Sequence, residues 1–347
     1  MNEEYSIRKM DPTKATDEEL VKLFDLLNLL IREKDKDEPL PTKEYRLKSF
    51  RFKEPDFDEH FWLVWKDDEV IGFSGLTIRT KASVSYEKNK HVCYFTIRIR
   101  KEYRRKGIGS KILLEIIKQA KKNRVITTLE CNTTYESGFE FCKKLQGILA
   151  LESIENRCYL KEVNWEMMDD WRKQGQEKGK LEGRYLQWFE KCPEEIIKEY
   201  TKVYTETMNQ QPLGLIETRA KITPKSRRKQ EQDYINLGYI WYTVISREND
   251  DQISGVTDVT YIPERGHRIY QELTGVKSEF RKKGIGKWLK AEMLFYIKEN
   301  YPNVQYIITG NASSNAAMLS INTRMGFKQY EHKKTYMFKL SDLEKRL

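Results

Sequence analysis

An eleven-residue motif that occurs twice constrains the fold of this chain more than any other feature of its sequence. Residues 99–109 read IRKEYRRKGIG, and residues 276–286, which begin 177 positions later, read VKSEFRKKGIG. Six of the eleven positions are identical and four more are conservative. Because this period is far too long for a solenoid repeat, it indicates the duplication of a whole domain.

The elements predicted around the two copies follow the same order. Each copy comes after an apolar, strand-like run and opens an amphipathic helix, over residues 110–122 and 287–300. Each half then closes with a strand, a helix and a hairpin, and the two hairpins are expected over residues 148–163 and 327–339. Strands joined by hairpins, with one helical crossover, predict a mixed, mostly antiparallel sheet flanked by helices, which is an α/β (α+β mixed) fold class.

The length of the chain agrees with a duplication. At about 150 residues per domain, 347 residues make two domains or three. We expect an N-terminal domain over residues 1–165, a polar linker helix over 166–180 and a C-terminal domain over 181–347.

Composition and charge exclude several classes of protein. Apolar residues make up 39% and charged residues 33% of the chain, which excludes a disordered protein or a disulfide mini-scaffold. The net charge of +10 is thinly spread and fits a polyanionic partner of any size, from a nucleotide cofactor to RNA. A solvated basic surface is the alternative.

Several expected absences indicate a cytoplasmic protein. The amino terminus has no apolar run, so no signal peptide is expected, and no stretch approaches the 18 apolar residues of a membrane span. The five cysteines lack CxxC spacing and are expected to be reduced, mostly buried thiols. The four histidines lie far apart, so no metal site is expected.

The repeated motif has the composition of a phosphate-binding loop. Gly284 and Gly286 let the backbone turn tightly and bring its N–H groups close to an anion. The helix that follows adds the positive end of its dipole, and basic residues surround the glycines. The motif matches neither the P-loop nor the GxGxxG fingerprint, and a structural turn is the alternative.

Both copies resemble the acetyl-CoA signature of the GCN5-related N-acetyltransferase (GNAT) superfamily. That signature is Arg-x-x-Gly-x-Gly between a strand and a helix, and it is present at residues 104–109 and 281–286. Residues 309–327, TGNASSNAAMLSINTRMGF, are similar to the segment TxNAxxNxxMxxxNxxLGF of bacterial tandem GNAT enzymes. The first half has CNTTYESGFEFCKKLQGI at residues 131–148, where only Asn132 and a degenerate Gly-Ile remain.

The resemblance implies where acetyl-CoA binds. The strand before the loop carries a bulge in this family, and its backbone pairs with the pantetheine amides, while the next strand splays away to leave a cleft. The positions that match the cofactor-binding residues are, in the second half, Thr274, Gly275, Val276, Arg281, Lys282, Lys283, Gly284, Ile285, Gly286, Lys287, Asn311 and Asn315, and, in the first half, Ile97, Arg98, Ile99, Arg104, Arg105, Lys106, Gly107, Ile108, Gly109 and Ser110.

The resemblance also implies a general base on the strand before the loop. Glu272 lies four residues before Val276, and strand alternation places Glu272, Thr274 and Val276 on one face. Asp258, on the preceding strand, is the reserve candidate for the same cleft. A surface carboxylate that pairs with Lys or Arg is the alternative for Glu272.

The usual general acid of the family is absent from both halves. It is a Tyr four residues before the Gly of the closing Gly-Phe, a position taken by Asn322 in the second half and by Lys143 in the first. Asn322 can donate a hydrogen bond but cannot deliver a proton. Asn315 and Asn322 are seven residues apart, which predicts a polar cleft wall, or else a helix N-cap at Asn315 and a solvated Asn322.

Together these features predict an acetyl-CoA-dependent N-acetyltransferase of two tandem GNAT-like domains, with the C-terminal domain catalytic. The expected acceptor is a primary amine of a small molecule or peptide, while nucleic acid, membrane and metal are not expected. One alternative is a tandem GNAT that transfers another acyl or aminoacyl group; the other is a CoA-binding sensor or scaffold without catalysis.

Overall fold

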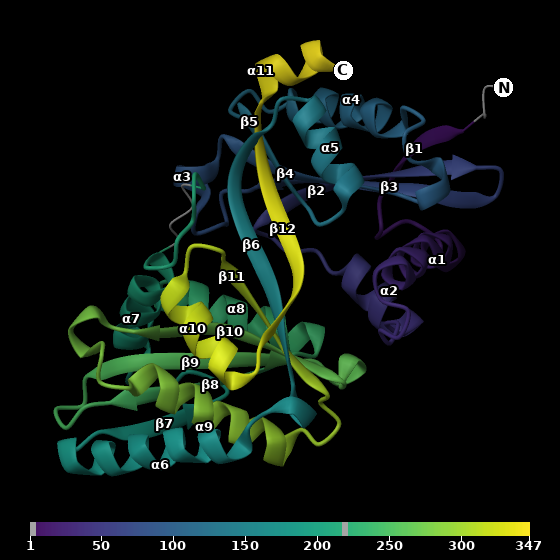
Figure 1. The fold of residues 1–347 in the computed structure, drawn as a ribbon. Coiled ribbons are helices and arrows are strands. Elements are labelled where there is room, and N and C mark those ends of the chain that lie inside the picture. Colours follow the sequence, from purple (N-terminus) through teal and green to yellow (C-terminus); the bar gives the residue numbers. More distant parts are fainter. Residues whose placement is uncertain (1–4, 217–220) are drawn as a thin grey trace. The chain divides into compact units, whose positions relative to one another are not determined.

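The computed structural model describes residues 5–216 and 221–347, which divide into two compact units. The first unit contains the described residues of Met1–Leu151, Gly214–Thr218 and Lys333–Leu347. The second unit contains those of Glu152–Leu213 and Arg219–His332. In each unit a sheet is flanked by helices (Figure 1), which confirms the predicted fold class.

The first unit is built on strands from both ends of the chain. Its sheet has the order β1-β2-β3-β4-β5-β12, and only the β4–β5 pair is parallel among the described pairings. A capping box of Thr16 and Glu19 opens α1. The elements are β1 (Ser6–Met10), α1 (Asp17–Lys34), α2 (Lys43–Arg51), β2 (Phe57–Lys66), β3 (Glu69–Arg79), α3 (Tyr86–Asn89), β4 (Val92–Ile99), α4 (Ile108–Ala120), β5 (Thr128–Thr133), α5 (Glu136–Lys144), the end of β12 (Lys328–Lys339) and α11 (Leu340–Leu343).

The second unit repeats this plan. Its sheet has the order β6-β11-β10-β9-β8-β7, and β10–β11 is the parallel pair among the described strands. The helix after Thr223 begins at Pro224, again with a capping box. The elements are β6 (Ile148–Tyr159), α6 (Trp165–Glu182), β7 (Tyr185–Phe189), α7 (Ile197–Asn209), α8 (Pro224–Leu237), β8 (Ile240–Arg247), β9 (Ile253–Tyr261), β10 (Arg268–Val276), α9 (Ile285–Asn300), β11 (Tyr306–Ala312) and α10 (Ala316–Met325).

The two closing segments are long single strands, so the prediction of two hairpins is wrong. β6 and β12 are each twelve residues long and lack Gly and Pro, the residues that favour a tight turn. Residues 153–159 of β6 pair with β11 in the second unit, whereas residues 334–339 of β12 pair with β5 in the first unit. The last strand of the chain therefore completes the sheet of the first unit.

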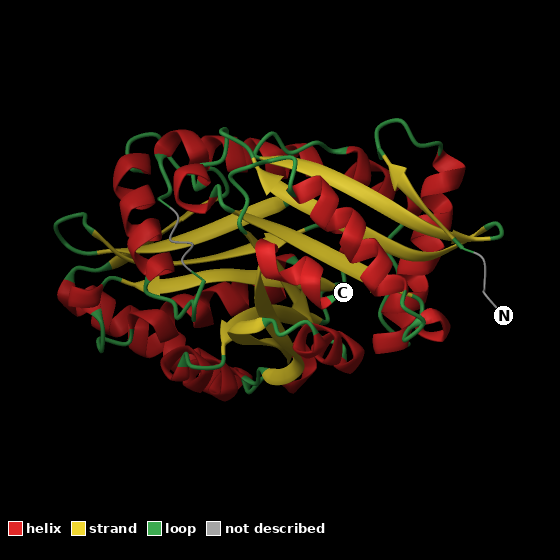
Figure 2. Cartoon of the chain, turned by 90° about the horizontal axis from the view of Figure 1, so that it is seen from above, coloured by secondary structure: helices red, strands yellow, loops and turns green. Residues whose placement is uncertain are grey.

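Each sheet has a hydrophobic core on both faces, because helices lie on both sides of the strands (Figure 2). In the first unit, α4 packs on one face through Ile112, Leu113 and Ile116, and α1 covers the other through Leu20 and Leu23. In the second unit the corresponding helices are α9, with Leu289, Met293 and Ile297 in its core, and α7, with Ile197, Tyr200 and Val203. The loop before α4 and the loop before α9 are thus held at the edge of a rigid layer.

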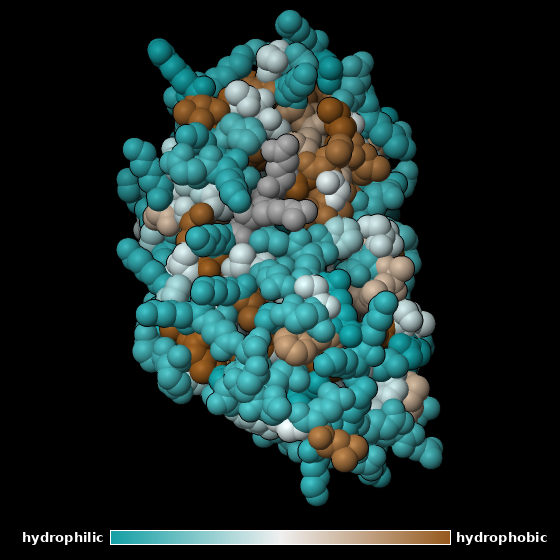
Figure 3. Space-filling view, turned by 90° about the vertical axis from the view of Figure 1, so that its left-hand side faces the viewer, coloured by the Kyte–Doolittle hydropathy of each residue, from teal (hydrophilic) through white to brown (hydrophobic). Residues whose placement is uncertain are grey.

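The surface is largely hydrophilic, and the cysteines lie in the interior. Hydrophilic side chains cover most of the face seen in Figure 3, in line with the high content of charged residues. All five cysteines are buried and free. Across residues 5–216 and 221–347, no helix has the length and apolar character needed to cross a membrane.

The exchange of closing strands gives a stability prediction. Phe338 on β12 is 2% exposed, and its ring lies 6.0 Å from that of Phe95 in the first unit. Phe338→Ala should therefore destabilise the first unit by about 3–5 kcal/mol, the usual loss for a buried Phe. Hydrogen exchange should speed up over residues 92–99. The control is Phe327→Ala, which removes a buried ring from the second unit and should leave residues 92–99 protected from hydrogen exchange. If residues 92–99 exchange faster only in Phe327→Ala, the assignment of β12 to the first unit is contradicted.

Candidate functional site

A one-residue register shift distorts β10 just before the second copy of the repeated motif. Gln271 pairs with Val259, but Thr274 pairs with Thr257, so Glu272 and Leu273 together face the single residue Asp258. Two residues opposite one define a β-bulge, which bends its strand and redirects side chains. The bulge expected on this strand is therefore present.

The same strand separates from its parallel neighbour. β10 and β11 pair only from Arg268 with Tyr306 to Tyr270 with Ile308, although β10 continues to Val276. Thr309 makes a last contact across the gap, as its hydroxyl donates to the carbonyl of Gln271 at 3.3 Å. Beyond this point the backbone edge of β10 that faces β11 is available to an extended ligand, as the predicted splay requires.

The loop after β10 leads into α9 with a backbone suited to an anion. Lys282 and Gly284 both have positive φ values, 65° and 86°, and Gly284 caps the helix that begins at Ile285. No atom lies within 4 Å of the position that a Cβ on Gly284 would take, so the turn is open to a ligand. The N–H groups at the start of α9 point toward this opening; that of Lys287 donates to the Gly284 carbonyl at 3.1 Å, which leaves those of Ile285 and Gly286 for an anion.

Basic side chains surround the loop. Arg281, Lys282 and Lys283 are exposed, whereas Gly286 and Lys287 are half-buried in the first turn of α9. The Arg281 guanidinium donates to the carbonyl of Val276 and to the side chain of Gln210. The positive φ at two positions, the open space and the local excess of cations fit a diphosphate.

Helix α6, which sequence analysis treats only as a linker, forms one wall of this region. An open depression of about 280 Å³ lies between α6 and the loop. The Lys287 ammonium lies 5.3 Å from the ring of Trp171 on α6. The residues that line the depression are Trp171, Gln174, Gly175, Lys178, Arg184, Lys282, Lys283, Gly284, Ile285, Lys287 and Trp288.

The two candidate bases lie in different surroundings. Asp258 is fully buried, whereas Glu272 keeps an exposed edge and accepts a hydrogen bond of 2.7 Å from the Thr260 hydroxyl. Burial raises the pKa of the Glu272 carboxyl; the Thr260 hydroxyl lowers it, and nearby Asp258 raises it further. Of the two, only Glu272 can reach a ligand outside the core.

The expectation that Glu272 shares a face with Thr274 and Val276 is wrong. Val276 packs in the core under α9, whereas Leu273 packs in the core under α7, on the face to which Asp258 and Thr260 also belong. The bulge adds one residue, so strand alternation reverses between Glu272 and Thr274. Glu272 therefore points to the α7 side of the sheet.

The asparagines after β11 do not form a continuous polar wall. Asn315 is the N-cap of α10, where its side chain accepts from the Met318 N–H, so the N-cap interpretation is confirmed. Asn322 is buried rather than solvated, and its amide donates to Asn311 at 2.8 Å. Only Asn311 and Asn315 keep partial exposure.

The loop of the first unit has the same backbone conformation, but the strand before it has a different geometry. Arg105 and Gly107 have φ values of 65° and 79°, Ile108 starts α4, and Gly109 and Ser110 follow in its first turn. β4, however, pairs with β3 in constant register from Cys93 to Ile99, a range that includes Ile97 and Arg98, so the bulge expected there is absent from these described pairs. Phe95, which is buried, takes the place of Glu272 four residues before the end of the strand.

Charge also distinguishes the two loops. In the first unit the Arg104 guanidinium forms a bidentate ion pair with Glu33 on α1, with N–O distances of 2.7 and 2.6 Å. In the second unit the corresponding Arg281 meets the neutral Gln210 at the end of α7. Lys106 of the first loop is exposed, like Arg105. The arginine of the first loop is therefore neutralised by a carboxylate, whereas that of the second meets an amide.

Comparison with known proteins identifies relatives of both halves. The sequence model of the Acetyltransferase (GNAT) family matches residues 23–147 and 199–327. A tandem GNAT protein from the clavulanic acid biosynthesis pathway, solved without AcCoA, has a TM-score of 0.76 at 17% identity and covers 97% of this chain and 99% of its own. A GCN5-related N-acetyltransferase from Sphaerobacter thermophilus has a TM-score of 0.67 at 12% identity, with 97% and 96% covered. No curated protein matches the chain.

The close approach of α7 to β10 gives a prediction. A Cβ on Gly275 would lie 2.3 Å from the Cβ of Thr207, a buried residue of α7. Gly275→Ala should therefore destabilise the protein by about 1–3 kcal/mol, measured by urea unfolding. Gly286→Ala is the matched control, since its Cβ would meet only Val276 at 3.6 Å. Equal stability of the two variants would contradict this packing.

Proposed function

The chain belongs to the acetyltransferase (GNAT) family, with two copies of the family domain in tandem, and from this premise we propose that its second unit transfers an acetyl group from acetyl-CoA to a primary amine. Family membership supports acyl transfer in general; the acetyl donor and the amine acceptor are the proposal. The observation that carries it is the combination, in one unit, of the bulged β10, its separation from β11 and the open basic loop before α9.

In this proposal the acyl donor is held mainly by the backbone. The N–H groups of Gly284 to Gly286 and the dipole of α9 bind the pyrophosphate, with Arg281, Lys282, Lys283 and the Lys287 side chain adding charge. The backbone of Thr274, Gly275 and Val276 pairs with the pantetheine arm, and Asn311 and Asn315 border the cleft. Fixed dipoles of this kind both orient the thioester and stabilise the oxyanion that forms at its carbonyl.

Glu272 is the proposed general base. The amine must lose a proton as it attacks the thioester carbonyl, and a carboxylate accepts this proton best when its pKa is raised toward working pH. Burial raises the pKa of Glu272, and the bulge directs its side chain out of the α9 core. We assign the proton taken up by the departing thiolate to water, since Asn322 has no proton to give and is buried.

The difference between the bulged β10 and the regular β4 supports turnover in the second unit alone. The first unit lacks a carboxylate at the position of Glu272 and pairs its loop arginine with Glu33. Its loop nevertheless has the same backbone conformation, so CoA binding without catalysis is its proposed role. The proposed acceptor is a small-molecule or peptide amine in the cytoplasm.

A matched pair of loop variants tests which unit is active. Gly284 and Gly107 have the same left-handed conformation and the same open surroundings, so a Val at either position introduces the same backbone strain. Gly284→Val should abolish acetyl transfer, measured as free-thiol release with a panel of primary amines. Gly107→Val should keep most of the turnover. The reverse pattern would move the active site to the first unit.

The role of Glu272 is tested by the pH–rate profile. Glu272→Gln should lower turnover by about 10²–10⁴-fold at neutral pH, the usual contribution of a general base. Wild-type turnover should fall as the pH drops through the raised pKa of Glu272, because the base becomes protonated. The variant should lack this acid limb and keep its affinity for CoA. A loss of only a few-fold would mean that positioning alone carries the reaction.

A further inference from the structure

A buried carboxylate lies directly under the β10 bulge. Asp258 Oδ1 accepts the backbone N–H of Leu273 at 2.8 Å, and Oδ2 accepts the Trp241 indole N–H at 2.8 Å and the Tyr204 hydroxyl at 3.1 Å. Asp258 is fully buried, so it is shielded from solvent. In all three hydrogen bonds the carboxylate is the acceptor.

The contact with Leu273 has a structural purpose. A bulge places one extra peptide group in the strand, and the ladder offers no carbonyl partner for its N–H. A buried N–H without an acceptor is strongly unfavourable. Asp258, the single residue opposite Glu272 and Leu273, supplies that acceptor, and Gln271 strengthens the arrangement by donating to the Asp258 carbonyl at 2.8 Å.

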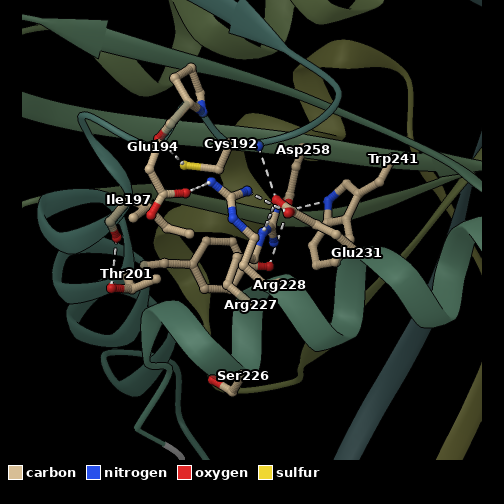
Figure 4. A network of polar contacts seen from close by, with 12 residues as sticks. Cys192, Glu194, Ile197, Thr201, Ser226, Arg227, Arg228, Glu231, Trp241 and Asp258 are labelled. Atoms are coloured by element: carbon tan, nitrogen blue, oxygen red, sulfur yellow. Dashed lines mark hydrogen bonds and ion pairs between the residues drawn. The ribbon is translucent and has the colours of Figure 1, made fainter.

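The negative charge of Asp258 has a buried counterpart on α8. The Arg227 side chain is 1% exposed, its guanidinium carbon lies 3.5 Å from the centre of the Trp241 ring, and its Nε donates to Glu231. Its Nη1 and Nη2 make no hydrogen bond to any described residue. Figure 4 shows Arg227 and Arg228 beside Glu231 and Asp258, and Arg228 also forms an ion pair with Glu194 at 2.6 Å.

Charges in a protein core persist only when they are compensated. We propose that Arg227 is a positioning residue: it keeps Asp258 ionised, and ionised Asp258 holds the extra peptide of the bulge that aims Glu272 and the β10 backbone. The inference rests on the proposed function of the second unit. It also gives Asp258 the role of a positioning residue in place of the reserve base.

The first unit provides an internal comparison. Gly72 pairs with Ile99 and Gly255 with Val276, so three residues further along the chain Gly75 takes the place of Asp258. No carboxylate is available at Gly75, and the register of β4 is unshifted over the described pairs.

The arginine itself is present in both units. Arg46 and Arg227 each lie four residues after the Thr that caps their helix, and both are buried. Arg46 donates to the Asn28 side chain at 2.6 Å, whereas Arg227 stacks on Trp241, whose indole N–H donates to Asp258. The bulge therefore accompanies the aspartate opposite it, whereas a buried arginine at this helix position is common to both units.

The mechanism predicts a specific dependence on pH. Burial raises the pKa of Asp258, while Arg227 and the hydrogen bonds from Trp241, Tyr204 and Leu273 lower it. Without Arg227 the pKa rises further, so Asp258 takes up a proton at a higher pH. A protonated carboxyl can donate only to the Tyr204 hydroxyl, since its other two partners are N–H groups, and the Leu273 N–H is left with a neutral and therefore weaker acceptor. The other charged or titratable groups near Asp258 are Tyr200 and Tyr204 of α7, Arg228 and Glu231 of α8, Cys192 before α7 and Glu272 of β10.

The first test uses variants of the full-length chain. Arg227→Met should lower acetyl transfer at pH 7 by about 10²-fold, the usual effect of a small misplacement of catalytic groups. Turnover should recover at alkaline pH, where Asp258 ionises again, and Arg227→Lys should restore activity at pH 7. Asp258→Asn should be impaired without recovery at any pH, because its amide always presents a donor to one of the N–H groups. Lys225→Met, on the exposed first turn of α8, is the control for loss of charge and should match the wild type.

The second test does not depend on activity. Hydrogen exchange over residues 268–276 should be faster in Arg227→Met and Asp258→Asn than in the wild type, and unchanged in Lys225→Met. If the wild type acetylates no amine, the proposed function fails, while this measurement still decides the positioning role. Wild-type exchange together with a wild-type pH profile in Arg227→Met would overturn the inference. If Arg227→Met does not fold, as judged by circular dichroism, wild-type exchange in Asp258→Asn would overturn it.

Discussion

An additional peptide group in a paired strand can be kept only if something accepts its N–H, and in this protein that acceptor is the Asp258 carboxylate. The geometry of the candidate site follows from this contact. It reverses the side-chain alternation of β10 and turns Glu272 toward α7. It also brings Gly275 against Thr207, where only a glycine fits. The site therefore depends on a hydrogen bond that lies on the α7 face of the sheet, whereas α9 and its loop lie on the opposite face.

The two units show what a shared motif does and does not determine. Both loops place a basic residue and a glycine in the left-handed region, at Arg105 and Gly107 and at Lys282 and Gly284. The conformation of the loop is thus encoded locally in the repeated residues. The strands before the loops differ because their neighbours differ, with a glycine at position 75 and an aspartate at position 258. Duplication has preserved the anion-binding turn and let the surrounding sheet diverge.

The sequence was sufficient for features that are local. The repeated loop and the N-cap at Asn315 both depend on residues a few positions apart. α2 was missed because its sequence, KEYRLKSFR, is polar and has no apolar stripe to reveal it. The face of Glu272 was predicted wrongly because a bulge depends on the opposing strand, which alternation within one strand cannot reveal. The burial of Asn322 likewise depends on packing between distant segments.

The pairing of β12 with β5 has a consequence for synthesis of the protein on the ribosome. The sheet of the first unit is complete only when residues 334–339 have left the exit tunnel, although its other strands end at residue 133. At about 5–20 residues per second, translation of the intervening stretch takes roughly 10 to 40 s. During that interval one edge of β5 lacks its partner and exposes unpaired backbone groups, a state prone to aggregation. The sheet of the first unit is therefore completed only after the residues of the second unit have been synthesised.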